Sequence, residues 1–77
     1  MSYKHKNYYF QLGLNIAYYR KLRGLTQMEL AEIIEISRTH MSNIEAPNVK
    51  KAISLDVLFN LAEALEVEPS RFLEIRN

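Results

Sequence analysis

The sequence contains no cysteine and no apolar run long enough to cross a membrane. Without cysteine, neither a disulfide nor a thiolate metal site can hold the fold together. A membrane span needs roughly 18 apolar residues, and residues 1–7 lack the apolar stretch of a secretory signal. We therefore expect a cytoplasmic protein with no membrane partner.

Residues that commonly carry catalysis are also scarce. The only two histidines, His5 and His40, stand far apart in the sequence, and no nucleophile is paired with a base. No cluster of residues has the spacing of metal ligands. We therefore predict that the protein is not an enzyme and needs no metal or cofactor.

Seventy-seven residues fit a single domain, and 48% of them are hydrophobic, which is enough for one compact core. A chain of this length buries only about 60% of the surface that its unfolded form exposes. Its margin of stability is therefore thin, and self-association is expected.

The net charge is only +1, so charge alone does not indicate a nucleic-acid partner, whose phosphates bind clustered Lys and Arg. The two signs of charge nevertheless fall mostly in different segments. Eight of the ten basic residues are Lys4, Lys6, Arg20, Lys21, Arg23, Arg38, Lys50 and Lys51. Six of the nine acidic residues fall mostly in other segments: Glu29, Glu32, Glu63, Glu66, Glu68 and Glu74. This distribution predicts one positive and one negative face.

With only two Gly and two Pro, the chain has few interruptions, and its apolar spacing predicts an all-α fold of five helices. The first helix runs from about Phe10 to Arg23. It ends there because Gly24 tolerates a left-handed backbone. Residues 1–9 are interpreted as an N-terminal arm and residues 10–77 as the folded domain.

The second and third predicted helices are separated by a short turn. Thr26 and Glu29 have the spacing of a capping box, which begins the second helix. A break follows at Glu35 and Ile36, and the Ser37 hydroxyl can then cap a third helix. The pattern predicts a helix, a tight turn and a helix.

A loop over residues 46–53 is predicted next, because Pro47 disfavours helical geometry at the residue before it. A fourth helix follows Ser54. Its apolar stripe consists of Leu55, Leu58, Phe59, Ala62 and Leu65. Pro69 suits the first turn of a short fifth helix. The apolar residues of this last segment are Phe72, Leu73 and Ile75.

From Thr26 to Glu45 the sequence reads T-Q-x-E-L-A-x-x-I-x-I-S-R-T-x-M-S-x-I-E. This order resembles the phage repressor and Cro-type helix-turn-helix regulators, also called the xenobiotic-response-element family. The similarity extends from about Leu12 to Leu73 and includes L-x-x-L-F-x-L-A-x-A-L-x-V and P-S-R-F-L. It implies a compact lambda-repressor-like DNA-binding domain, encoded by a bacterium or phage, whose helices 2 and 3 form the helix-turn-helix.

Two helices that cross steeply need a small residue at their contact, and Ala31 meets this need. With apolar neighbours buried around the crossing, the polar face of the third helix points outward. In a helix that enters the major groove, Arg can read guanine and Asn can read adenine. The candidate base-reading residues are Arg38, Thr39, Ser42 and Asn43.

Contacts to DNA phosphates are expected from Gln27 and Ser37, beside the N-terminal N–H groups of both helices. The resemblance also places the loop after the third helix along the DNA backbone. It therefore implies phosphate contacts from Asn48, Lys50 and Lys51, and each lysine should steepen the salt dependence of binding.

The resemblance further implies a partly buried salt bridge between Arg20 and Glu45. Loss of one partner of such a pair removes roughly 3–5 kcal/mol of stability. The sequence departs from the family pattern at two places. Glu35 replaces the usual Gly of the turn, which adds roughly 1 kcal/mol of strain, and Ala46-Pro47 replaces the Gly that usually follows the motif.

Some residues have two interpretations. His40 is either an exposed packing residue or a DNA contact, and residues 3–6 are either a disordered terminus or an arm that follows the DNA. Four tyrosines suit either the core and a dimer contact or base stacking: Tyr8, Tyr9, Tyr18 and Tyr19.

Two functions follow from these features. The first is a sequence-specific transcription regulator that binds a palindromic operator as a homodimer, with self-association through Phe72, Leu73 and Ile75. The second is a protein-interaction module, such as a toxin-neutralising antitoxin, with or without DNA binding. A steep salt dependence and a loss of affinity on Arg38→Ala would distinguish the first from the second.

Overall fold

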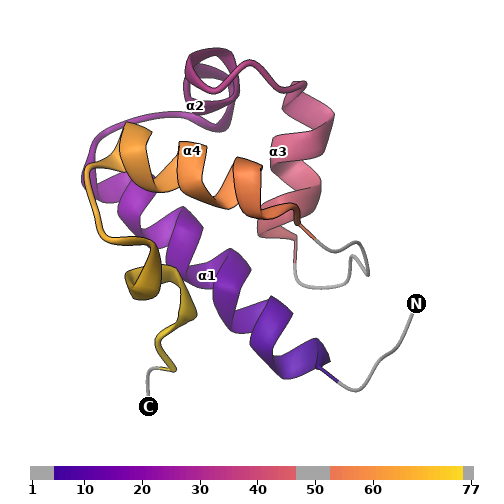
Figure 1. The fold of residues 1–77 in the computed structure, drawn as a ribbon. Coiled ribbons are helices and arrows are strands. Elements are labelled where there is room, and N and C mark those ends of the chain that lie inside the picture. Colours follow the sequence, from indigo (N-terminus) through magenta and orange to yellow (C-terminus); the bar gives the residue numbers. More distant parts are fainter. Residues whose placement is uncertain (1–4, 47–52, 76–77) are drawn as a thin grey trace.

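The computed structural model describes residues 5–46 and 53–75. Within these ranges the chain forms four α-helices, one 3-10 helix (η1) and no strand. The elements are α1 (Lys6–Leu22), α2 (Gln27–Ile33), α3 (Arg38–Glu45), α4 (Leu55–Leu65) and η1 (Pro69–Leu73). Figure 1 shows α2 and α3 at one end of the molecule, and η1 packs against α1.

The predicted all-helical fold is confirmed, but the fifth segment is a 3-10 helix rather than an α-helix. It contains only five residues, a length at which the tighter 3-10 winding is common.

The first helix begins earlier than its apolar pattern indicates. It starts at Lys6 rather than Phe10, and the His5 carbonyl accepts bonds from the N–H groups of Tyr8 and Tyr9 at 3.0 and 3.1 Å. Both tyrosines are exposed, so this first turn contributes nothing to the core pattern. Residues 6–9, which the sequence assigned to an arm, are therefore helical, and residues 1–4 lie outside the described part.

Hydroxyl groups cap the other three α-helices, as predicted for Thr26 and Ser37, and the predicted start after Ser54 is also capped by its hydroxyl. Thr26 and Glu29 form the capping box, with the Glu29 N–H donating to Thr26 Oγ1 at 3.0 Å and the Thr26 N–H donating to Glu29 Oε1 at 2.8 Å. Ser37 and Ser54 accept bonds from the N–H groups three residues later, at 2.9 and 3.1 Å. These local contacts satisfy donors that the first turn leaves unpaired.

Three helices end in the same way, with a left-handed residue whose N–H bonds back to the last turn. The left-handed residues are Gly24 after α1 (φ 72°), Glu35 after α2 (φ 61°) and Glu66 after α4 (φ 59°). Only glycine adopts this backbone without strain, because a side chain crowds the next carbonyl by roughly 1–2 kcal/mol. The turn between α2 and α3 therefore contains the strain expected from Glu35.

Glu35→Gly should raise the free energy of unfolding by roughly 1 kcal/mol, because glycine removes the left-handed strain. Glu32→Gly is a matched control on the exposed side of α2, where glycine should instead lower stability by roughly 1 kcal/mol. Urea unfolding followed by circular dichroism measures both. If both variants are destabilised, strain at Glu35 is not significant.

The core lies between α1, α4 and the helix-turn-helix. It consists of Leu12, Ile16, Leu30, Ala31, Ile34, Met41, Leu58, Leu61, Ala62, Leu65 and Phe72. Phe72 is fully buried, with its ring 6.0 Å from that of Tyr19. The prediction that Phe72 forms a dimer surface is therefore wrong, because this side chain fills the core beneath η1.

A buried amide holds the C-terminal segment against α1. The side chain of Asn15 is 1% exposed and donates to the carbonyls of Phe72 and Glu74 at 2.9 and 2.7 Å. Its own oxygen accepts from the Gln11 amide at 3.1 Å. The bonds fix the backbone after α4 to the middle of α1.

Candidate nucleic-acid interface

The third helix turns one face to the core and the other outward. Met41, at its centre, is fully buried, and Ala31 of α2 is 2% exposed where the two helices pack. Ile36 and Ile44 are half-buried against the same core. With these apolar groups inside, the polar residues of α3 other than Glu45 are left on the outer face.

The predicted base-reading residues lie together on this outer face. Arg38, Thr39 and Ser42 are exposed, and Asn43 is half-buried. With Gln27, which begins α2, they line one open hollow. The helix-turn-helix thus gathers a guanidinium, two hydroxyls and two amides in one place, all groups that hydrogen-bond to base edges or phosphates.

Two of the residues predicted to contact phosphate, Gln27 and Ser37, lie within the described residues. Each side chain already makes one hydrogen bond to another group of the protein. Ser37 is exposed, and its oxygen accepts the capping bond from the His40 N–H. The hydroxyl proton of Ser37 remains a donor. Gln27 is half-buried and donates from Nε2 to Glu45 Oε1 at 3.0 Å.

The structure joins Arg20 and Glu45 in a bidentate pair. Arg20 Nε lies 2.7 Å from Glu45 Oε2, and Arg20 Nη2 lies 2.9 Å from Glu45 Oε1. The two side chains are only 10% and 5% exposed, and Arg20 Nη1 also donates to the Leu25 carbonyl at 2.8 Å. Parallel charge-assisted bonds of this kind are strong and directional. The pair therefore fixes the C-terminal end of α3 to α1.

A glycine allows α1 and α3 to approach at the same point. A Cβ built on Gly13 would lie 2.8 Å from the Ile44 carbonyl oxygen and 3.3 Å from that of Glu45. Because these atoms belong to the backbone, a larger residue would push the end of α3 away. The lone glycine inside an otherwise helical pattern was the sequence signal for this contact.

The predicted dimer contacts Leu73 and Ile75 do not line this hollow. Asn48, Lys50 and Lys51 lie outside the described residues. Leu73 and Ile75 are 61% and 54% exposed near α1, in the segment held by Asn15. Sequence reasoning also missed Asn15, although a polar residue among the apolar positions of α1 was the available signal.

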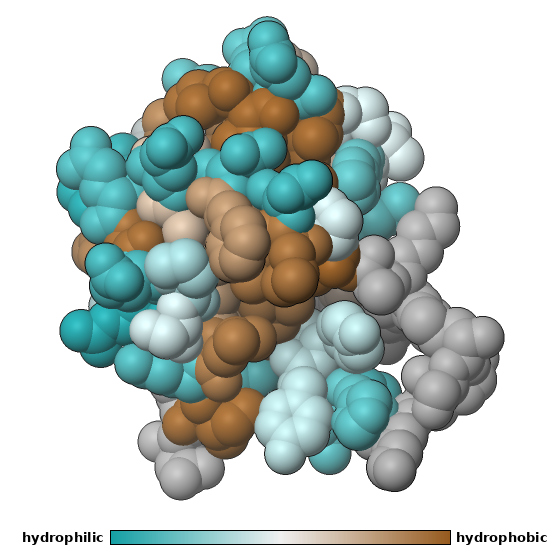
Figure 2. All heavy atoms as spheres, in the orientation of Figure 1, coloured by the Kyte–Doolittle hydropathy of each residue, from teal (hydrophilic) through white to brown (hydrophobic). Residues whose placement is uncertain are grey.

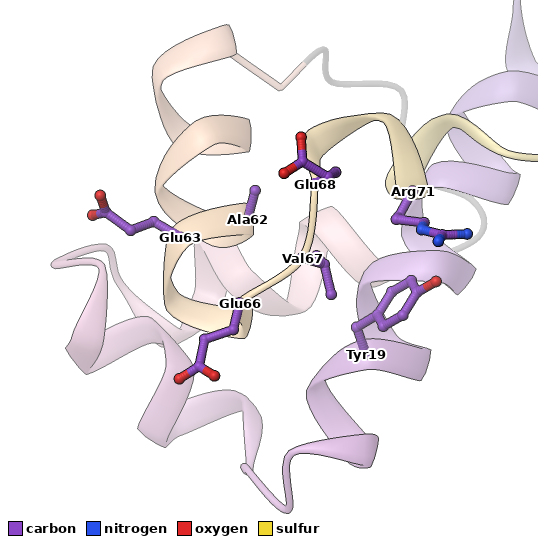
Figure 3. A pocket seen from close by; sticks show the side chains of 7 residues that line it. All are labelled: Tyr19, Ala62, Glu63, Glu66, Val67, Glu68 and Arg71. Carbon is purple, nitrogen blue, oxygen red and sulfur yellow. The ribbon is translucent and has the colours of Figure 1, made fainter.

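A second hollow lies between α4 and η1, lined by Tyr19, Ala62, Glu63, Glu66, Val67, Glu68 and Arg71. Figure 3 shows three glutamate side chains around it. Their charges repel phosphate, so this hollow does not suit nucleic acid.

Among residues 5–46 and 53–75, no three His, Asp or Glu side chains are grouped to hold a metal ion. No helix in those ranges is long and apolar enough to cross a membrane.

Comparisons with known proteins agree with this geometry. Residues 16–72 match the family model described as helix-turn-helix. A similar solved structure is that of the restriction-modification controller protein C.AhdI from Aeromonas hydrophila, which is 26% identical with a TM-score of 0.81. The similarity covers 90% of this chain and 97% of that chain. A search of curated proteins found no match. The chain therefore belongs to the Cro/C1-type helix-turn-helix family of DNA-binding transcription regulators.

Proposed function

We propose that this chain is a sequence-specific regulator that binds a palindromic operator as a homodimer, with α3 in the major groove. The observation that supports this proposal is the hollow shared by Gln27, Arg38, Thr39, Ser42 and Asn43. Arg38 can donate two bonds to guanine, and the Asn43 amide can pair with adenine. The hydroxyls of Thr39 and Ser42 can bond to either base edges or phosphate.

Contacts to the DNA backbone position this reading face. Gln27 and Ser37 lie where α2 and α3 begin, and their side chains keep one N–H and one O–H as donors for phosphate oxygens. The proposal also includes Asn48, Lys50 and Lys51, which follow α3 in the sequence. The two lysines would add counterion release, and hence salt dependence, to the neutral contacts of Gln27 and Ser37.

The exposed end of the C-terminal segment is the proposed dimer surface. Figure 2, drawn in the orientation of Figure 1, shows hydrophobic residues at the lower left of the molecule, where Figure 1 places the end of η1. The exposed apolar residues at the end of η1 and just after it are Leu73 and Ile75. A two-fold dimer would place two copies of α3 about 34 Å apart, one turn of DNA. A monomer would contact only one half-site.

The proposed function is tested by selecting duplexes from a random library with the purified protein and measuring affinity across a salt series. We expect a two-fold symmetric site whose half-sites are about 10 base pairs apart, and an affinity that falls steeply with salt. No enrichment at low salt would contradict the proposal.

Arg38→Ala should lower affinity for the selected site roughly 5- to 150-fold, because a bidentate contact to guanine is lost. Lys21→Ala is the matched control, since it removes a positive charge from the exposed side of α1 and leaves α3 unchanged. Fluorescence anisotropy with the selected duplex measures both variants. Equal losses in the two variants would indicate a general charge effect and exclude base reading by Arg38.

A second candidate function is binding to a protein partner, such as a toxin or another regulator. One observation favours it. Large apolar residues at four-residue spacing are exposed along α1: Phe10 (42%), Leu14 (46%), Tyr18 (47%) and Leu22 (65%). A side of α1 that is apolar although it faces solvent suits a protein contact. On this hypothesis Leu14→Glu would abolish partner binding, and Arg38→Ala would leave it unchanged.

A further inference from the structure

The carboxylate of Glu45 accepts more hydrogen bonds than its salt bridge requires. Its Oε2 accepts from Arg20 Nε, and its Oε1 accepts from both Arg20 Nη2 and Gln27 Nε2. The Arg20 bonds form the complete bidentate pair. The bond from Gln27 is an additional one, and it leads from the buried pair to the hollow on the outer face of α3.

This third bond determines how the Gln27 amide is oriented. A carboxylate can only accept hydrogen bonds, so the amide must turn its NH2 group, and not its oxygen, toward Glu45. One N–H is then occupied and one N–H remains. A phosphate oxygen is likewise only an acceptor, so the remaining N–H is the one group of this amide that can bond to it.

A long, unrestrained glutamine would lose rotamer freedom when it bound DNA. The half-buried Gln27 side chain has already lost part of this freedom, because its amide is held 3.0 Å from a carboxylate that is only 5% exposed. Part of the loss of side-chain entropy therefore occurs during folding and not during binding, which raises the affinity for DNA.

We propose that Glu45 is a positioning residue for DNA binding, in addition to its part in the fold, because it holds the Gln27 amide with one N–H available to a DNA phosphate. This inference rests on the proposed function. It makes Gln27 and the buried pair of Glu45 and Arg20 one hydrogen-bonded unit that connects the core to the reading face.

Gln27→Met tests the donor directly, because methionine has a similar length and no N–H. We expect it to weaken binding roughly tenfold for the selected operator and for unrelated duplex alike, since a phosphate contact carries no sequence information. The melting temperature should change little. Gln11→Met is the matched control, because that amide also donates to a side-chain oxygen but lies outside the hollow. Its affinity should be unchanged.

Glu45→Asp tests the positioning step, because the shorter side chain keeps a carboxylate but withdraws it from Gln27. Affinity is measured in a double-mutant cycle with Gln27→Met, at a temperature where circular dichroism shows every variant folded. We expect Glu45→Asp to weaken binding in the wild-type chain and to have little further effect beside Gln27→Met.

Two results would overturn the inference. One is independent, additive losses in the cycle, which would mean that Glu45 acts only through the fold. The other is an unchanged affinity for Gln27→Met, which decides the question even if the Glu45→Asp variant does not fold. Failure of the wild-type protein to bind any duplex is a different result, because it would contradict the proposed function itself.

Discussion

Glu45→Ala is expected to lower the free energy of unfolding by about 3–5 kcal/mol, the usual consequence of removing one partner of a buried ion pair. The substitution leaves the Arg20 guanidinium buried without its carboxylate, while its bond to the Leu25 carbonyl remains. Small domains have little stability to lose. Chemical denaturation at 25 °C should show a largely unfolded variant that no longer binds DNA.

Glu66→Ala is the matched control for this prediction. Glu66 also pairs with an arginine, but its carboxylate is 75% exposed and lies 3.7 Å from Arg23 Nη2. Exposed pairs of this kind contribute about 0–1 kcal/mol. Comparable losses for Glu66→Ala and Glu45→Ala would show that burial is not the source of the effect.

Asn15→Leu is expected to have the second largest effect on stability. The leucine keeps the approximate volume but leaves the carbonyls of Phe72 and Glu74 without their donor, at about 1–3 kcal/mol for each group that stays buried. The C-terminal segment should then separate from α1. We expect a lower urea midpoint and, because the proposed dimer surface follows Phe72, weaker self-association by analytical ultracentrifugation.

The control for Asn15→Leu is Asn60→Leu on the exposed side of α4, which should change stability by less than about 0.5 kcal/mol. If Asn15→Leu unfolds at the wild-type urea concentration, the amide does not hold the segment. If stability falls but self-association is unchanged, the dimer surface lies elsewhere.

The helix boundaries that could be predicted from sequence depend on neighbours in the chain. Thr26, Ser37 and Ser54 each bond to an N–H three residues later, so the residue types and their spacing were sufficient evidence. Gly24 likewise ends α1 through its own backbone preference. The start of α1 was misjudged because the turn at Tyr8 and Tyr9 has no side facing the core.

The features that sequence reasoning missed depend on residues far apart in the chain. Asn15 bonds to carbonyls 57 and 59 positions later, and Gly13 is needed only because the backbone of Ile44 passes beside it. No local pattern gives the direction of such contacts. The burial of Phe72 was missed for the same reason, because it depends on the C-terminal segment packing back against α1.

The residues of the candidate site were easier to predict than the hydrogen bonds that hold them in place. The polar residues Arg38, Thr39 and Ser42 had to face outward once Met41 was buried, and this follows from helical periodicity alone. Helical periodicity does not predict the hydrogen bond from Gln27 to Glu45, because this bond joins the first residue of α2 to the last residue of α3. Only the crossing of the two helices brings them together.

This arrangement has a mechanical consequence for α3. Its eight residues are attached to α1 at the C-terminal end, by Glu45 and by the close approach at Gly13, while Arg38 lies at the opposite end in solvent. The short turn also joins its N-terminal end to α2, so the two helices would tilt together. At 1.5 Å per residue α3 is about 12 Å long, and a tilt of about 5° at Glu45 would move Arg38 by about 1 Å. In the proposed regulator, substitutions near Glu45 and Gly13 would thus alter operator preference by moving the Arg38 guanidinium, although neither residue is a candidate base contact.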